Sequence, residues 1–222
     1  MYEFPDHVDH PALAATVPWA GEHRILLLGR PKSVNALGAR GSRMAVSGQK
    51  KQWQQATAKL LMEAAPGARF GYVEAAAELR YDRELNRFDE DNFRSPIAKF
   101  LGDALDGGPP WRNAGGRWLP DDSSEFFRLR SVDYRVVRKV KGASTALFDE
   151  QRRMEAPSTL IVVKYLERCP HEFGPAKQTP EGPRRSLCAL PREHVGECLS
   201  MSRARTAWQE PAAFGWREGV KP

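Results

Sequence analysis

The chain has 222 residues, of which 41% are hydrophobic and 28% are charged, with a net charge of +6 and an isoelectric point of about 9.4. This composition fits one substantial folded domain with appendages, or two small domains, and excludes a chain that is disordered throughout. The longest apolar runs, residues 25–28 and 160–163, are far shorter than the roughly 20 residues that span a bilayer, so we expect no membrane insertion.

The positive net charge indicates a polyanionic partner, because a positive field attracts polyanions and raises their encounter rate. Basic residues gather in two parts of the chain, before and after a central acidic motif. A solvated basic surface is the alternative explanation of such clusters. The candidate contacts to a nucleic acid or another polyanion are Arg30, Lys32, Arg40, Arg43, Lys50, Arg128 and Arg130.

The first 81 residues predict a lead-in, a strand, a helix and a second strand. Residues 1–22 contain three prolines and no apolar periodicity, so we expect a loosely ordered segment. Residues 25–28 predict a short buried strand, followed by a basic loop over 29–47. Apolar residues then recur at helical intervals over 48–64, and residues 70–81 alternate as a strand does.

A second helix is expected from Ser95 and Pro96 to Leu105. A serine oxygen can cap free N–H groups, and proline suits the first helical position. On this helix Lys99 and Asp103 lie four residues apart and share a face. They form either a surface ion pair or, with Lys99 over a metal site, a positive charge that offsets charge building on a phosphate.

The rest of the chain predicts two more strands and an extension. Residues 125–141 read as a long strand with a bulge near 131–133, where the apolar phase slips. A short helix is possible over 141–157, and residues 159–166 are rich in β-branched strand formers. We therefore divide the chain into a lead-in (1–22), a core domain (23–167) and a proline-rich C-terminal extension (168–222).

Three aspartates suggest a metal site. Asp89 and Asp91 are two residues apart, so in an extended segment both side chains leave one face. Asp122 would arrive from a distant part of the chain, with Lys99 between them. Carboxylates are the ligands that Mg²⁺ prefers when it holds phosphate oxygens. Alternatively, Asp89 and Asp91 cap the following helix and Asp121 and Asp122 form a turn.

The order of these parts resembles the RusA family of Holliday junction resolvases over about residues 23–166. The matching parts are the segment 24–35, a basic loop, a helix, a strand, Asp89-Glu90-Asp91-Asn92, Lys99, Asp103-Ala104-Leu105 and the segment 118–122. The interval from Asp91 to Lys99 is longer than is usual in the family. The C-terminal extension has no counterpart.

The resemblance implies a small α+β fold, with a mixed sheet of about four strands and two main helices, beside an irregular extension. It implies a homodimer that binds four-way DNA junctions and cuts them with paired symmetric nicks, in DNA recombination and repair. Asp89, Asp91 and Asp122 would bind Mg²⁺, for which Mn²⁺ could substitute, and Lys99 would be the essential lysine. These four would be the catalytic residues.

The extension carries three cysteines and two histidines whose residue types fit zinc: Cys169, His171, Cys188, His194 and Cys198. No C-x-x-C pair is present, so the pattern favours reduced thiols and surface histidines over a zinc site. Acidic residues and histidines, in place of a secretory leader, begin the chain. This favours the cytoplasm, where a DNA-cutting enzyme would associate with the nucleoid.

Three interpretations follow from the sequence. The first is a Mg²⁺-dependent endodeoxyribonuclease that resolves four-way junctions as a homodimer, since paired nicks on a two-fold substrate call for two related sites. The second is a related nuclease for flaps or replication forks. The third is a non-catalytic DNA-binding or scaffold protein.

Overall fold

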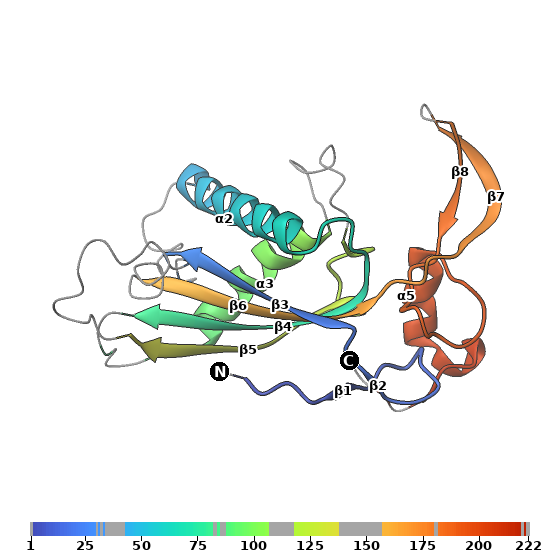
Figure 1. Cartoon of the computed structure of the whole chain (residues 1–222), viewed down its shortest axis with the longest axis horizontal. Helices are drawn as coiled ribbons and strands as arrows, with labels where there is room; N and C mark the ends of the chain where they lie inside the picture. Colours follow the sequence, from blue (N-terminus) through green and yellow to red (C-terminus); the bar gives the residue numbers. More distant parts are fainter. Residues whose placement is uncertain are drawn as a thin grey trace.

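The computed structural model describes residues 2–29, 31, 33, 43–81, 84, 88–106, 118–137, 157–179, 182–218 and 220. Its centre is a four-stranded mixed sheet made of β3 (Gly21–Leu28), β4 (Phe70–Tyr81), β5 (Phe127–Val136) and β6 (Ser158–Glu167), in the order β3-β6-β4-β5 (Figure 1). β6 runs antiparallel to both of its neighbours, whereas β4 and β5 are parallel. The α+β class and the mixed four-stranded sheet predicted from the sequence are confirmed.

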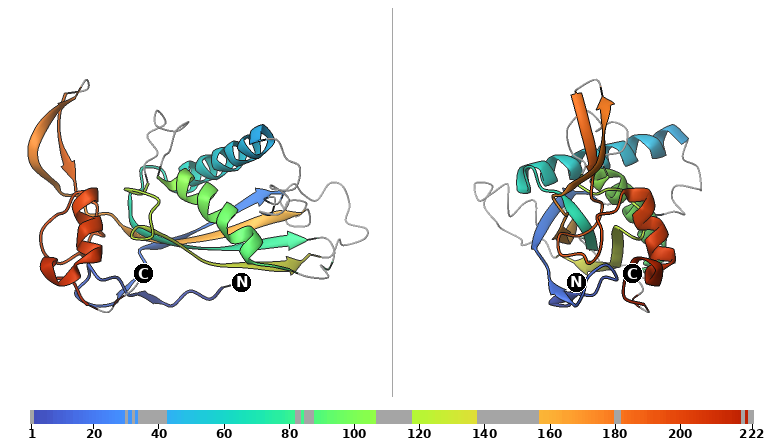
Figure 2. Two further views of the ribbon diagram at one scale, coloured as in Figure 1. Left: turned by 180° about the vertical axis from the view of Figure 1, so that it is seen from behind. Right: turned by 90° about the vertical axis from the view of Figure 1, so that its right-hand side faces the viewer.

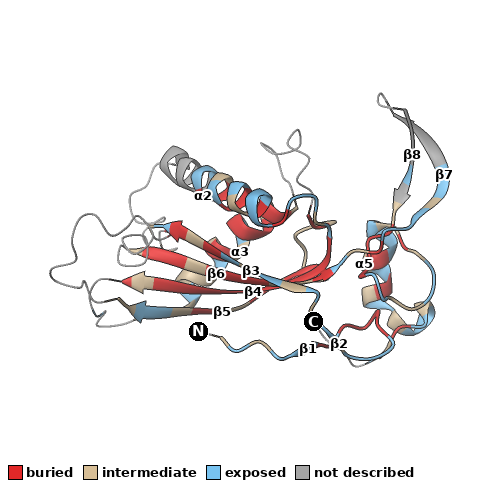
Figure 3. Ribbon diagram, in the orientation of Figure 1, coloured by how far each residue is buried: buried red, intermediate tan, exposed pale blue. Residues whose placement is uncertain are grey.

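Two helices, α2 (Arg43–Ala64) and α3 (Asp91–Leu105), lie on the same side of the sheet (Figure 2). The strand residues that face them are apolar, including Val73, Ala75 and Leu79 of β4. The apolar stripe of α3, which includes Ile97 and Leu101, is fully buried against that face. Figure 3 shows the consequence: β4 is buried along almost its whole length, and most of β6 is buried.

Helix α3 begins one turn earlier than the sequence predicts and includes Pro96 in its interior. Proline lacks the N–H that would bond to the carbonyl of the fourth preceding residue. The extra first turn is held by Arg94, which donates to Glu90 at 2.5 Å and to the carbonyl oxygens of Leu129 at 2.8 Å and Arg130 at 3.0 Å. Tertiary hydrogen bonds therefore compensate for the break that proline introduces.

The strand bounds match the sequence expectation closely for β4 and β6, but β3 starts four residues early and β5 ends before residue 137. The expected irregularity in β5 is present. Ala75 pairs with Leu129 and Ala76 with Ser131, so Arg130 is the extra residue of a bulge. The possible helix over residues 141–156 falls outside the described residues.

The N-terminal segment is packed, contrary to the loose lead-in that its prolines suggested. It contains the short strands β1 (His7–Val8) and β2 (Val17–Pro18), and it runs along the sheet face opposite the helices (Figure 1). Val8 and Leu13 are almost fully buried, and Trp19 stacks on Tyr72 of β4. Apolar contact with the sheet thus orders this segment.

The C-terminal extension is more regular than predicted. It comprises the hairpin strands β7 (Glu172–Thr179) and β8 (Gly182–Leu187), the helix α5 (Met201–Gln209) and the 3₁₀ turn η1 (Pro211–Phe214). The hairpin projects from one end of the sheet (Figure 1). Trp216 is buried against His10, so the tail docks on the body of the same chain. None of the described helices is long and apolar enough to cross a bilayer.

Candidate functional site: an acidic cluster and a thiol cluster

Three aspartates converge at the C-terminal end of α3. Asp106 follows the helix directly, and Asp121 and Asp122 lie in the loop that leads to β5. One carboxylate oxygen from each lies within 4.8 Å of the others. The loop is fastened to the helix, because the Trp118 and Leu119 N–H groups both donate to the Leu105 carbonyl, at 3.1 and 3.0 Å. We call Asp106, Asp121 and Asp122 the acidic cluster.

Gly102 is what allows the loop to approach α3 so closely. A Cβ atom at this position would lie 3.0 Å from the Cβ of Asp122, tighter than ordinary van der Waals contact. The glycine therefore fixes where the Asp122 carboxylate sits relative to the helix.

Lys99 joins the acidic cluster to the helix. Its Nζ lies 2.6 Å from Asp103 Oδ1 and 2.8 Å from Asp122 Oδ2. Hydrogen bonds to Asp103 and Asp122 raise the pKa of Lys99, so it remains an ammonium group at any physiological pH. Gln54 of α2 donates to the other oxygen of Asp103 at 2.6 Å. Asp103 and Asp122 thus hold the ammonium group from two sides, and Gln54 in turn holds Asp103.

Asp121 is held by a second cation. Arg205 of α5 forms an ion pair with Asp121, and the Ser123 N–H donates to the same carboxylate at 3.1 Å. Burial opposes ionisation of Asp121, but the hydrogen bonds from Ser123 and Arg205 outweigh it, and the pKa of Asp121 is lowered. Lys99 and Arg205 therefore offset the mutual repulsion of neighbouring carboxylates.

The structure does not bring Asp89 and Asp91 together with Asp122. Asp91 is the first residue of α3, eleven residues before Gly102, and a helix rises about 1.5 Å per residue. Asp91 and Gly102, next to which Asp122 lies, are therefore separated by about 16 Å along the helix axis. This is too far for carboxylates that must each approach one ion to within about 2.6 Å. Asp89 instead accepts a hydrogen bond from Asn92 at 2.7 Å, near the helix start.

The two halves of the predicted metal site also face different parts of β5. Phe88 packs on Tyr134, and Glu90 accepts a hydrogen bond from the Val132 N–H at 3.3 Å. Asp122 precedes the opposite end of the same strand. The predicted set of three ligands is therefore split along α3, and Asp106 and Asp121 take the places beside Asp122.

The predicted DNA contacts are placed only in part. Arg128 is half-buried on β5, and Arg130 is paired with the buried carboxylate of Glu74 on the sheet face opposite the helices. Arg130 is therefore a structural cation rather than a free phosphate contact. Arg43 and Lys50 lie in α2, where their side chains are outside the described part, as are Arg30, Lys32 and Arg40 altogether.

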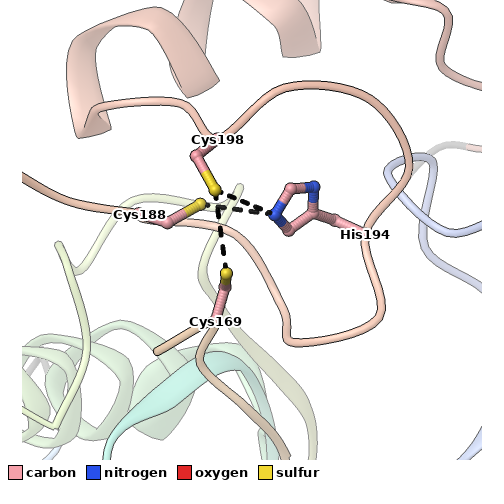
Figure 4. A group of neighbouring side chains, drawn as sticks. All are labelled: Cys169, Cys188, His194 and Cys198. Atoms are coloured by element: carbon pink, nitrogen blue, oxygen red, sulfur yellow. Dashed lines mark hydrogen bonds between the residues drawn. The ribbon is translucent and has the colours of Figure 1, made fainter. Parts of the chain in front are cut away.

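A second group of ligand-type side chains lies where the extension leaves the sheet (Figure 4). Cys169, Cys188, His194 and Cys198 each place one ligand atom within 4.8 Å of the others. Cys188 Sγ lies 3.5 Å from His194 Nε2, Cys198 Sγ lies 3.8 Å from the same nitrogen, and Cys169 Sγ lies 3.9 Å from Cys198 Sγ. We call these four residues the thiol cluster.

The thiol cluster corrects the expectation of scattered thiols and surface histidines. Cys169 and Cys188 are buried, and burial together with the neighbouring thiols raises the pKa of Cys198 to about 12. His171, the other histidine among the candidates from the sequence, is exposed and is not part of the cluster. Within the cluster, only His194 and Cys198 are close in sequence, four residues apart, and the other two ligands meet them through the tertiary fold.

No protein-family model matches the chain, and no curated protein matches it. By its structure the chain is an α+β protein with a lysine-bridged acidic cluster and a separate group of three thiols and an imidazole.

Proposed function

We propose that this protein is a Mg²⁺-dependent endodeoxyribonuclease that acts on branched DNA, with the four-way junction as its substrate. The observation that carries the proposal is the position of Lys99, 2.8 Å from Asp122, which itself lies within 4.8 Å of two further carboxylates. Hard carboxylate oxygens with an ammonium group next to them suit a divalent cation that holds a phosphate. The resemblance to the RusA family implies the same chemistry, and Asp122 and Lys99 are the two residues that it shares with this arrangement.

The residues of the acidic cluster would divide the work in a simple way. Asp122 would be the central ligand because it lies next to Lys99, and Asp106 and Asp121 could add oxygens from the helix end and the loop. Bound Mg²⁺ would supply an activated water and shield the phosphate charge. Lys99 would turn from Asp122 toward the phosphate and stabilise the charge that grows on its oxygens. Asp103 and Gln54 would keep the lysine oriented.

A junction resolvase needs two such centres related by two-fold symmetry, so we propose a homodimer. The net charge of +6 favours association with DNA at low salt. Its place of action would be the cytoplasm, on the nucleoid, and its role would lie in recombination and repair.

The second candidate is a non-catalytic DNA-binding protein. The separation of Asp89 and Asp91 from Asp122 favours it, because the carboxylate set that the family uses is not assembled around one ion. The acidic cluster would then be a structural ion-pair network in which Lys99 and Arg205 replace the metal ion.

Labelled four-way junction, flap and linear duplex, each incubated with and without Mg²⁺, separate the candidates. We expect metal-dependent cleavage of the junction, its loss in Asp122→Asn and its retention in Asp91→Asn. Loss in Asp91→Asn with retention in Asp122→Asn would place the metal at the start of α3 instead. Cleavage of flaps in preference to junctions would change the substrate, and junction binding without any cleavage would establish the second candidate.

A further inference from the structure

We propose that Cys169, Cys188, His194 and Cys198 bind one structural Zn²⁺ ion. The proposal is independent of the nuclease function, because the thiol cluster shares no residue with the acidic cluster. It rests on the shape of the cluster, the chemistry of its four donors and the part of the fold that it joins.

Three distances within the thiol cluster match the edges of a tetrahedral zinc site, and all four ligand atoms lie within 4.8 Å of one another. Zinc bonds of about 2.3 Å to sulfur and about 2.0 Å to nitrogen give sulfur–sulfur edges of about 3.8 Å and sulfur–nitrogen edges of about 3.5 Å. The structure has 3.9 Å between Cys169 and Cys198, and 3.5 and 3.8 Å from His194 to Cys188 and Cys198. Figure 4 shows the three sulfur atoms and the imidazole nitrogen pointing toward a common centre.

The histidine presents the correct nitrogen. Its Nδ1 lies 3.3 Å from the Val195 carbonyl oxygen, an acceptor, so Nδ1 carries the proton and Nε2 offers a lone pair to the thiol side. A hydrogen bond from the non-ligating nitrogen is the usual way in which a protein orients a metal-binding imidazole. The imidazole is therefore positioned as a ligand before any ion arrives.

Backbone hydrogen bonds hold the segments that carry the cysteines. The Cys169 N–H donates to Leu190 at 2.9 Å, the Cys188 N–H donates to His171 at 3.0 Å, and the Ala189 N–H donates to Leu199 at 2.9 Å. These bonds connect the end of β6, the end of β8 and the chain just before α5 to one another. A rigid frame of this kind lowers the ordering cost of binding an ion.

The donor set selects zinc over the hard cations. Three thiolates and one imidazole are soft to borderline donors, which suit Zn²⁺ and not Mg²⁺ or Ca²⁺. Four protein ligands leave no open coordination position, and this closed arrangement is typical of a structural and not a catalytic zinc site.

The ion would fix the extension to the sheet. Cys169 lies just beyond β6, Cys188 just beyond β8, and Cys198 just before α5. One Zn²⁺ therefore sets the position of the hairpin and of the helix at the same time. The ion would thus also position the helix whose Arg205 pairs with Asp121.

The test is the zinc content of the full chain, which is purified without chelator and measured by elemental mass spectrometry. We expect about one zinc per chain, and Co²⁺ substitution should give the visible absorption bands of tetrahedral cobalt with sulfur-to-metal charge transfer. His194→Ala and Cys188→Ser should each lower the zinc content several-fold. His171→Ala is the matched control, because this histidine is close in sequence and exposed, and it should retain full zinc.

Because a ligand variant can fail to fold, His194→Cys provides a second test. Four thiolates bind zinc as well as three thiolates and one imidazole do, so this variant should keep its zinc and give cobalt bands of an all-sulfur site. The proposal is overturned if the wild-type chain takes up neither Zn²⁺ nor Co²⁺, or if His171→Ala loses as much zinc as His194→Ala. Resistance of two cysteines to alkylation until they are reduced would also overturn it, since a disulfide would then occupy the site.

Discussion

Arg205 in α5 forms an ion pair with Asp121, 84 residues earlier in the chain, and so joins the C-terminal extension to the acidic cluster. Asp121 is mostly buried and Arg205 is partly exposed. The pair is therefore a tertiary contact whose effect on stability can be read from its dependence on pH.

Arg205→Gln should lower the free energy of unfolding by about 1 kcal/mol at pH 7. The folded-state pKa of Asp121 lies below the ordinary value of 3.8, against the effect of burial, because of Ser123 and Arg205. The ionised Asp121 therefore stabilises the fold fully above pH 3.8, and this stabilisation is lost as the pH falls below 3.8. Urea unfolding at several pH values should show the variant and wild type converging below about pH 4.

Arg203→Gln is the control for this experiment. Arg203 is exposed on the same helix and lies over the Phe214 ring, 5.8 Å from its centroid. Its replacement should cost a similar or smaller amount that does not change between pH 7 and pH 3. A difference between wild type and Arg205→Gln that is constant across this range would contradict the assigned role of the ion pair.

Lys99→Gln should lower the rate of junction cleavage on the order of 100-fold, because a charge placed at the reacting phosphate acts mainly in the transition state. The Kd for the junction should change by less than about tenfold, since only one phosphate contact is involved. The measurement is single-turnover cleavage beside a binding titration. Lys59→Gln is the control, because Lys59 is exposed on α2 and pairs only loosely with Glu63, at 4.0 Å. Equal losses in rate and affinity would make Lys99 a binding residue.

His10 should make the protein less stable in mild acid. It is buried between Tyr72 and Trp208, its Nδ1 accepts the Ala12 N–H at 3.2 Å, and burial lowers its pKa to about 3 from 6.5. The unfolded state therefore binds the proton first. Above pH 6.5 His10 is neutral in both states and does not make the stability depend on pH. As the pH falls from 6.5 toward 3, the free energy of unfolding decreases by roughly 1.4 kcal/mol per pH unit.

His10→Phe should flatten the pH dependence of the unfolding free energy between pH 4 and pH 6.5, whatever its effect at pH 7. His7→Gln should keep the wild-type slope, because His7 is exposed. If both variants retain the slope, the proton is taken up elsewhere in the molecule.

Glu74→Ala should destabilise the fold by about 3 kcal/mol. Glu74 is 1% exposed and accepts the Tyr72 hydroxyl at 2.9 Å as well as Arg130, so its removal leaves a half-buried guanidinium without its partner. Glu22→Ala, at a partly exposed pair with Arg24, should cost under about 1 kcal/mol. The double variant Glu74→Leu with Arg130→Met should recover much of the loss in denaturant unfolding. A cost for Glu74→Ala equal to that for Glu22→Ala would show that the pair is not desolvated.

Local pattern was enough to find the central elements of the fold. The apolar stripe of α3 follows directly from its one buried face, and the pattern of residues 70–81 located β4, although both faces of that strand are buried. The phase slip in β5 predicted a bulge near residues 131–133, next to the bulge found at Arg130. The start of α3 could not be found in this way, because it depends on Arg94 reaching the carbonyl groups of a strand 35 residues away. The packed N-terminal segment likewise depends on contacts with Tyr72.

The sites were harder to predict because their ligands are distant in sequence. Lys99 and Asp103 share a face by helical spacing alone, whereas their meeting with Asp122 depends on a glycine that lets the loop approach. Asp89 and Asp91 do not meet Asp122 because they lie at the start of α3, whereas Asp122 lies beside its far end, and the helix is too long for the two ends to share an ion. The thiol cluster had no local spacing except that of His194 and Cys198, and the fold supplied the rest.

The strand order has a consequence for synthesis. β6 lies between β3 and β4, yet it is the last of the four sheet strands to be made, so Leu27 and Leu79 await partners such as Thr159 that are encoded far downstream. Until that stretch leaves the ribosome, two hydrophobic strands present unpaired edges to other molecules. A nascent chain stalled before Ser158 should therefore be aggregation-prone and bound by chaperones, and release of the next ten residues should end that dependence.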